Sequence, residues 1–320
     1  MERVVVTGPF NEVMKQALKK AFPDDFELEY ITSRKEYKRL SQADYTILRT
    51  LNYTAEDIAG MPKMKLIQRW GAGYDTVDIE AAGAKGIPVA VTYGMNATPV
   101  SEMALALTLS VYRNLVPLTV GIQAGKWERE YYANTSYTIH SKTVGLIGLG
   151  NIGRKTSALY RAFGANILYY DTYRPSVEDE LVMGVIYCEL DAMWEKCDII
   201  SLHAPLTDST NHLVNQDTIT KMKDGAVLIN TAREELIDAF ALAEALKSGK
   251  LLGAGLDAIE KSILVDNPFD GVKNIVFSGH LGGNTVDNAE HMAARCAEQI
   301  ISVSRSESLQ PPHVVNSYLL

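Results

Sequence analysis

Three glycines, Gly148, Gly150 and Gly153, follow a short apolar run and precede a helical pattern. The first permits a tight turn, the second lets the backbone approach a pyrophosphate, and the third lets the helix pack closely on the strand. Amide groups at the start of the helix, with the positive end of its dipole, would hold the phosphates. This spacing predicts a dinucleotide-binding turn, and the alternative is a structural turn with chance glycines.

Asp171 ends the next apolar run, 18 residues after Gly153. A carboxylate at this point accepts hydrogen bonds from ribose hydroxyls and repels a 2′-phosphate, so NAD is favoured over NADP. Arg174 follows three residues later and is a cation that would soften this preference.

Two further residues have the chemistry that a nicotinamide enzyme needs. Arg233 follows the apolar run 227–232, and its forked donors suit the carboxylate and oxo group of a 2-oxo acid. His280 follows another apolar run and can exchange a proton with the substrate. The alternatives are a structural ion pair and a buried structural histidine. His203, just before Pro205, is interpreted as a backbone or nicotinamide contact rather than the acid.

The apolar runs before these residues predict a parallel sheet with its ligands at the carboxyl ends of the strands. Strands and helices also alternate before residue 97, which predicts a second, smaller α/β domain. A long apolar helix between the two is expected to have Thr98 as its cap, Pro99 as its first residue and a kink at Pro117. The tyrosine-rich arm 125–141 is interpreted as a dimer contact, or else as an arm folded on its own subunit.

The composition limits the class of protein. The chain has 320 residues, 47% hydrophobic and 22% charged, which suits about two globular domains. A net charge of −8, without runs of Lys or Arg, argues against nucleic acid and anionic membranes as partners. Three cysteines without a CxxC pair predict reduced thiols and no metal site. With no signal-peptide core and no run of 18 apolar residues, a cytoplasmic location is expected.

The chain resembles the D-isomer-specific 2-hydroxyacid dehydrogenase family in five motifs that occur in the family's order. They are GAGYD at 71–75 with Val77-Asp78, GLGNIG at 148–153, LHAPLT at 202–207, NTAR at 230–233 and SGHLGG at 278–283. The resemblance implies NADH-dependent reduction of a 2-oxo acid to a D-2-hydroxy acid, or the reverse.

The same resemblance implies an α/β fold of two Rossmann-like or flavodoxin-like parallel-sheet domains. Residues 1–97 and 289–320 would form the substrate domain, and the NAD-binding domain, 98–288, would be inserted into it. It also implies a homodimer through the cofactor domain and a site in the cleft between the domains.

Carried over by position, Arg233 resembles the substrate arginine and His280 the acid/base. The amides around Ala72 and Gly73 resemble the loop that holds the substrate carboxylate, and Asp257 the acid near the nicotinamide carboxamide. The implied cofactor-binding residues are Gly148, Gly150, Asn151, Ile152, Gly153, Asp171, His203, Pro205, Thr210, Thr231, Ala232, Asp257, His280 and Gly282.

One departure concerns the partner of the histidine. Five positions after Asp257 the family carries a glutamate that orients the histidine and stabilises its charged form, and this chain has Ser262. The family also often has glycine after the arginine, where this chain has Glu234. We hypothesise that Glu260, or else Glu234, replaces the missing carboxylate. Without a replacement, we expect reduction to favour a more acidic pH; the other possibility is an irregular loop that tolerates serine.

A protein that senses NAD(H) through a dimer, with weak or no turnover, is the competing function. Retention of both Arg233 and His280 argues against it. The substrate side chain is expected to meet loops near Phe10, residues 49–52 and Trp70, which leaves glyoxylate, pyruvate, hydroxypyruvate and bulkier 2-oxo acids open.

Overall fold

A computed structural model describes residues 1–259 and 261–320, with the backbone alone for Lys261 and Ser262. The chain forms two compact units, Met1–Asn96 with Asn284–Leu320 (unit 1) and Ala97–Gly283 (unit 2). These units divide after residues 96 and 283, whereas the family resemblance implies domain boundaries after 97 and 288. The second difference arises because the C-terminal helix starts at Val286 and packs as a whole within unit 1.

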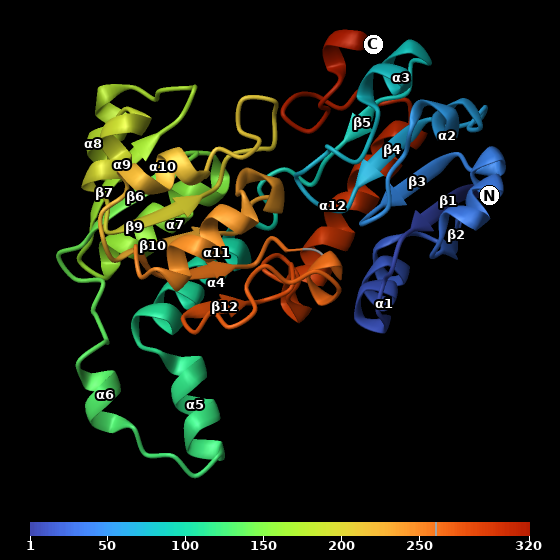
Figure 1. The fold of residues 1–320 in the computed structure, drawn as a ribbon. Helices are drawn as coiled ribbons and strands as arrows, with labels where there is room; N and C mark the ends of the chain where they lie inside the picture. Colours follow the sequence, from blue (N-terminus) through green and yellow to red (C-terminus); the bar gives the residue numbers. More distant parts are fainter. Residues whose placement is uncertain (260) are drawn as a thin grey trace. The chain divides into compact units, whose positions relative to one another are not determined.

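Unit 1 contains a five-stranded parallel sheet in the order β2-β1-β3-β4-β5, the flavodoxin-like order (Figure 1). Its strands are β1 (Glu2–Thr7), β2 (Phe26–Ile31), β3 (Tyr45–Leu48), β4 (Leu66–Arg69) and β5 (Val89–Ala90). Its helices are α1 (Glu12–Ala21), η1 (Arg34–Gln42), α2 (Ala55–Ala59), α3 (Ile79–Ala84), α12 (Val286–Ser304) and η4 (Ser317–Leu319).

Residues near the end of the sequence complete the sheet of unit 1. Helix α12 packs against α1 and β4. The buried side chain of Asn316 accepts a hydrogen bond from Val89 N at 2.8 Å and donates one to Ile87 O at 3.0 Å. Val314 forms an antiparallel bridge with Ala90. The edge strand β5 is therefore held by residues that lie more than two hundred positions later in the sequence.

Unit 2 contains a seven-stranded parallel sheet in the order β12-β11-β10-β9-β6-β7-β8. This order reverses direction between β6 and β9, as in dinucleotide-binding folds. Its strands are β6 (Thr143–Ile147), β7 (Asn166–Tyr170), β8 (Ile186–Tyr187), β9 (Ile199–Leu202), β10 (Ala226–Asn230), β11 (Leu251–Leu256) and β12 (Ile275–Phe277). The predicted fold class, two parallel-sheet α/β domains, is confirmed.

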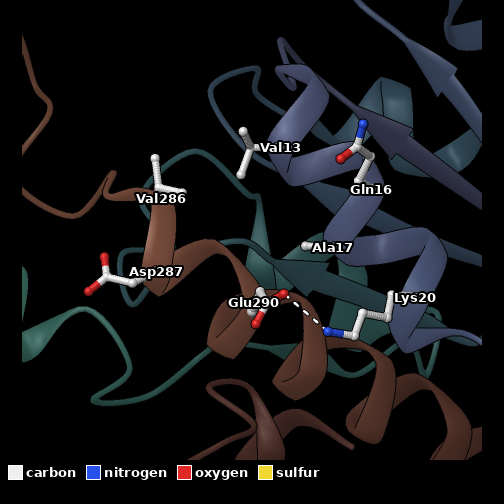
Figure 2. Close-up of a pocket in the computed structure, with 7 residues that line it drawn as sticks. All are labelled: Val13, Gln16, Ala17, Lys20, Val286, Asp287 and Glu290. Carbon is white, nitrogen blue, oxygen red and sulfur yellow. Dashed lines mark hydrogen bonds and ion pairs between the residues drawn. The ribbon is translucent and has the colours of Figure 1, made fainter.

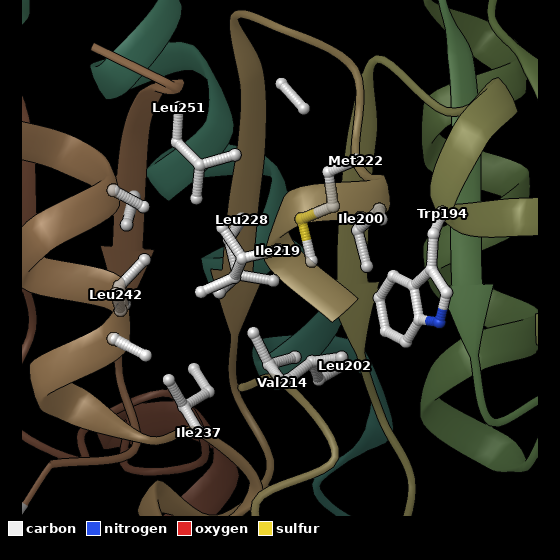
Figure 3. Close-up of a cluster of buried hydrophobic side chains, with 14 of the residues drawn as sticks. Trp194, Ile200, Leu202, Val214, Ile219, Met222, Leu228, Ile237, Leu242 and Leu251 are labelled. Carbon is white, nitrogen blue, oxygen red and sulfur yellow. The ribbon is translucent and has the colours of Figure 1, made fainter. Parts of the chain in front are cut away.

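Helices cover both faces of this sheet. Figure 3 shows one apolar layer, in which Trp194, Ile219 and Leu242 from the helices meet Ile200 and Leu228 from the strands. On the other face Leu107 and Tyr160 pack over Ile199 and Val227. Neighbouring residues of one strand thus enter opposite layers, which explains the continuous apolar runs in the sequence. The helices of unit 2 are α4 (Ala97–Tyr112), α5 (Leu115–Gln123), α6 (Arg129–Ala133), α7 (Asn151–Ala162), α8 (Val177–Met183), α9 (Leu190–Lys196), α10 (Gln216–Lys221), η2 (Glu234–Leu236), α11 (Ala239–Lys247) and η3 (Lys261–Leu264).

The long helix differs from the prediction at both ends. Helix α4 starts at Ala97, so Thr98 lies inside its first turn rather than at the cap, and Pro99 is tolerated there because first-turn amides have no intrahelical partner. The break is not at Pro117 but at Asn114, which has a left-handed backbone with φ +51°. Pro117 lies in the first turn of α5, where it again costs no hydrogen bond.

Helices α5 and α6 form an arm that extends away from the seven-stranded sheet (Figure 1). None of their residues is buried, and Trp127, just before α6, is 78% exposed. Asn114 fixes the base of this arm by donating to Thr135 O at 3.1 Å. Among the described helices, no single one is long and apolar enough to cross a membrane, although α4 and α5 taken together, with a 60° bend, have the length and composition.

Candidate active site at the carboxyl ends of the strands

The glycine turn after β6 has space where a phosphate group would bind. Gly148 has φ +99°, and a Cβ there would lie 2.7 Å from the carbonyl carbon of His203. A Cβ on Gly153 would collide with the carbonyl oxygen of Gly148, whereas one on Gly150 would meet nothing within 4 Å. Because Gly150 is also the N-cap of α7, no side chain caps the first amides of that helix. The turn therefore fits a pyrophosphate at a helix N-terminus.

Asp171 is fixed immediately after β7. Its Oδ2 accepts a hydrogen bond from Leu149 N at 2.6 Å, and its Oδ1 accepts one from Tyr173 N at 2.9 Å. The carboxylate thus joins the glycine turn to its own loop. Each oxygen retains a lone pair that a ribose hydroxyl can use.

Arg174 is engaged by a neighbouring acid. Its Nε and Nη2 donate to Oε1 and Oε2 of Glu180 at 2.7 and 3.1 Å. These hydrogen bonds hold the pKa of Glu180 below its usual range. The cation that would soften the NAD preference is therefore paired within unit 2.

His203 follows β9 and faces two hydroxyl groups. Its Nε2 lies 2.9 Å from Ser201 Oγ, and its Nδ1 lies 3.4 Å from Thr231 Oγ1. Burial lowers the pKa of His203 to about 3, so the imidazole is neutral near pH 7. The following loop is closed by Thr210, whose hydroxyl donates to Pro205 O at 2.7 Å. A neutral ring supports a contact role for His203 and argues against it as the acid.

We expect His203 to make folding acid-sensitive. In the unfolded chain the imidazole binds a proton near its ordinary pKa of 6.5, whereas in the folded chain it does so only near 3, so stability falls as the pH drops from 6.5 towards 3. Between pH 7 and 5 the free energy of unfolding of His203→Gln should fall less than that of the wild type, by about 2 kcal/mol. Urea unfolding at both pH values measures this. The control is His291→Gln, which removes an exposed histidine; equal losses in both variants would contradict the expectation.

Asn230 shapes the turn that carries Arg233. Its fully buried side chain donates to Arg233 O at 2.7 Å and accepts from Ala232 N at 3.0 Å. Sequence reasoning assigned no role to Asn230, although a polar residue closing an apolar strand is a signal that could have found it. This clamp holds the backbone of Thr231, Ala232 and Arg233, and the Arg233 side chain adds one hydrogen bond to the same turn, from Nη1 to Ala232 O at 2.8 Å.

Asp257 organises the loop that carries His280. It is 2% exposed, and its Oδ1 accepts from Ser278 Oγ at 2.7 Å, Leu281 N at 2.8 Å and Gly282 N at 3.1 Å. Gly282 approaches so closely that a Cβ there would lie 2.6 Å from Oδ2. In the structure Asp257 is thus bound to the loop, which adds a positioning role to the nicotinamide contact expected from the resemblance.

His280 is held with its side chain exposed on unit 2. Its amide donates to Asp257 O at 2.6 Å. Gly279 and His280 have φ values of +66° and +59°, two left-handed residues in succession. This conformation is costly for histidine and is maintained by the hydrogen bonds to Asp257, which makes the loop a defined support for the imidazole.

Unit 1 contains the loop after β4 that the family resemblance assigns to the substrate carboxylate. Arg69, the last residue of that strand, is buried and donates from Nε to Gly73 O at 2.9 Å and from Nη1 to Leu48 O at 3.0 Å. Gly71 O accepts from Thr92 N at 3.0 Å. The buried guanidinium of Arg69 thereby fixes the loop of Ala72 and Gly73. The sequence interpretation gave Arg69 no role.

The residues expected near the substrate side chain also gather in unit 1. The rings of Phe10 and Trp70 meet edge to face with centroids 5.2 Å apart. The guanidinium of Arg49 lies 5.9 Å from the Phe10 centroid. These three residues follow β1, β4 and β3, at the same edge of the sheet as the glycine loop.

A cavity of about 460 Å³ lies elsewhere in unit 1, between α1 and α12 (Figure 2). An ion pair of Lys20 and Glu290, with an N–O distance of 3.2 Å, crosses it. None of the predicted site residues lines this cavity, so we do not assign the chemistry to it.

The predicted replacement of the family glutamate cannot be followed in the structure. Glu260 lies outside the described residues, as does the side chain of Ser262, so the substitute for the family glutamate stays a sequence hypothesis.

Within residues 1–259 and 261–320, no group of three or more His, Cys, Asp or Glu side chains forms a candidate metal site.

The sheet order, the glycine turn and the fixed Asp171 define a dinucleotide-binding protein of the Rossmann class. Residues 105–282 match the model of the D-isomer specific 2-hydroxyacid dehydrogenase NAD-binding domain. The chain is 35% identical to hydroxypyruvate reductase of Thermotoga maritima over 93% of this chain and 97% of that protein. It is 37% identical to glyoxylate reductase of Thermofilum pendens over 83% of this chain and 79% of that protein.

Among solved structures, D-lactate dehydrogenase of Aquifex aeolicus in complex with NAD and lactic acid superposes with a TM-score of 0.86. Its sequence is 26% identical, and the match covers 98% of this chain and 99% of that one. The chain therefore belongs to the D-isomer specific 2-hydroxyacid dehydrogenase family. It is an enzyme of that family, with NAD(H) as its cofactor.

Proposed function

We propose that this enzyme interconverts a 2-oxo acid and a D-2-hydroxy acid by hydride transfer. One observation carries the proposal: the glycine turn, His203, Arg233, Asp257 and His280 follow five neighbouring strands of one parallel sheet. Ligands of such sheets bind outside the carboxyl ends of the strands, and this supports the proposal that these residues share one cofactor-binding edge.

In this proposal Arg233 binds the carboxylate and the oxo group of the substrate through its forked donors. The amides of Ala72 and Gly73, on the loop supported by Arg69, take the remaining carboxylate oxygen. His280 gives a proton to the carbonyl oxygen during reduction and removes it from the alcohol during oxidation. NADH supplies the hydride when it is bound. Glu260 or Glu234 would orient the imidazole in place of the family glutamate.

Hydroxypyruvate and glyoxylate are the first substrates to test, because relatives with 35% and 37% identity carry these names. The aromatic pair of Phe10 and Trp70 supports a wall beside the substrate side chain. Unit 1 would then be the substrate domain and unit 2 the cofactor domain. The unburied arm of α5 and α6 supports a homodimer, and the three buried, free cysteines support a cytoplasmic location.

The test is NADH oxidation, followed at 340 nm, with a panel of 2-oxo acids from pH 5 to 8. We expect turnover of at least one small 2-oxo acid and formation of its D-alcohol. Tight NADH binding without turnover of any member, at any pH, would overturn the proposal and favour a protein that senses NAD(H).

A further inference from the structure

The loop after Asp171 presents an arginine whose Nε and Nη2 both donate to one carboxylate, that of Glu180. Besides the two hydrogen bonds from Arg174, Oε1 of Glu180 accepts one from Tyr169 Oη at 2.5 Å. Glu180 is 7% exposed, although it belongs to the short surface helix α8. A buried carboxylate needs such partners, and charge-assisted bidentate pairs are among the stronger side-chain contacts.

The same guanidinium is directed towards the outer edge of the sheet. Its Cζ lies 4.7 Å from the ring centroid of Tyr187 on β8, the last strand. The glycine turn comes from β6, on the opposite side of β7. Glu180 and Tyr187 therefore hold the positive charge on the β8 side of β7, while the cofactor-binding turn lies on the β6 side.

We infer that Glu180 determines cofactor specificity by withholding Arg174 from the 2′-phosphate of NADP(H). An arginine three residues after the ribose-binding acid is the side chain best suited to bind that phosphate. Glu180 occupies Nε and Nη2 of the guanidinium and neutralises its charge, so a 2′-phosphate would have to compete with a partner that is already in place. NAD is thus selected twice, by repulsion from Asp171 and by sequestration of Arg174. The inference concerns the cofactor and does not depend on which 2-oxo acid is reduced.

The test is the dissociation constant of NADH and of NADPH, measured by cofactor fluorescence without substrate. In Glu180→Gln the amide oxygen still accepts from Tyr169, but the charge that holds Arg174 is removed. We expect the ratio of the NADPH to the NADH constant to fall about tenfold, the worth of one charge-assisted contact to phosphate. The double variant Glu180→Gln/Arg174→Gln should return to the wild-type ratio.

Glu178→Gln is the matched control, because it makes the same chemical change on the same helix at an exposed position. The inference is overturned if Glu180→Gln changes the ratio no more than Glu178→Gln does, or if the double variant keeps the gain. A second variant needs no change at Glu180: Arg174→Gln alone should leave the ratio unchanged. A loss of NADPH binding in that variant would show that Arg174 already reaches the phosphate. Absence of 2-oxo acid turnover would leave all these binding results intact.

Discussion

Replacing Arg233 with alanine is expected to lower kcat/KM for the 2-oxo acid by roughly a thousandfold. The substrate carboxylate and carbonyl would lose a bidentate, charge-assisted partner, and leaving a charged group unpaired costs several kcal/mol. Because about 1.4 kcal/mol corresponds to a factor of ten in rate, this loss amounts to roughly a thousandfold. The turn itself should persist, since the substitution removes one hydrogen bond, from the guanidinium to Ala232 O, and leaves the two that Asn230 makes to the carbonyl of residue 233 and the amide of Ala232. Steady-state kinetics with hydroxypyruvate or glyoxylate measures the effect.

Arg233→Lys is the matched variant, because lysine keeps the positive charge and loses the fork. We expect an intermediate loss, and an unchanged dissociation constant for NADH in both variants. If Arg233→Ala retained kcat/KM within threefold of the wild type, the arginine would be an ion-pair residue of the fold and not the substrate anchor.

Replacing His280 with asparagine should lower kcat by about 10²- to 10⁴-fold, the usual contribution of a general acid–base group. Asparagine is chosen because it tolerates the left-handed backbone found at this position, φ +59°, better than alanine does. The loss can then be ascribed to the missing imidazole. Circular dichroism and urea unfolding should show a fold as stable as the wild type.

The variant Asp257→Asn separates the support of the loop that carries His280 from proton transfer by its imidazole. An amide group there faces backbone amides that need an acceptor, so the loop of Ser278 to Gly282 should loosen and stability should fall. The limb of the pH–rate profile that reports the imidazole should persist in Asp257→Asn and vanish in His280→Asn. Persistence of that limb in His280→Asn would remove the histidine from the proton transfer.

Most of the strands could be predicted from the sequence because both faces are buried, which leaves continuous apolar runs such as 199–202 and 226–230. The glycine turn was predictable for a related reason: each glycine meets its own steric requirement, which residue type reveals directly. Strand β8 was missed because its two residues lie at the sheet edge, where Ile186 is exposed and no apolar run forms. The break of the long helix lies at Asn114 and not at the predicted Pro117, because Pro117 falls in the first turn of α5, where a proline costs no hydrogen bond, whereas Asn114 has a left-handed backbone.

The supports of the site were harder to predict than its reactive residues. Asn230 and Arg69 are polar residues at strand ends, and only the contacts of the folded chain show that they hold the turn of Arg233 and the loop of Gly73. The pairing of Arg174 with Glu180 also depends on how the loop returns to α8. Such partners are set by tertiary geometry, and a single sequence carries little trace of them.

The hold of Asn316 on strand β5 has a consequence for the order of events during translation. Unit 1 receives its sheet-completing residues only after all of 97–283 has been synthesised. Translation proceeds at about 5–20 residues per second, so the first 96 residues of unit 1 remain without their C-terminal partners for roughly 10 to 40 s. During this time the β5 edge is unpaired, and the surfaces of α1 and β4 that contact α12 are uncovered. Unit 2, whose residues are contiguous, can fold on the ribosome during that interval. We therefore expect any dependence on chaperones to arise from unit 1, whose synthesis begins first and is completed last.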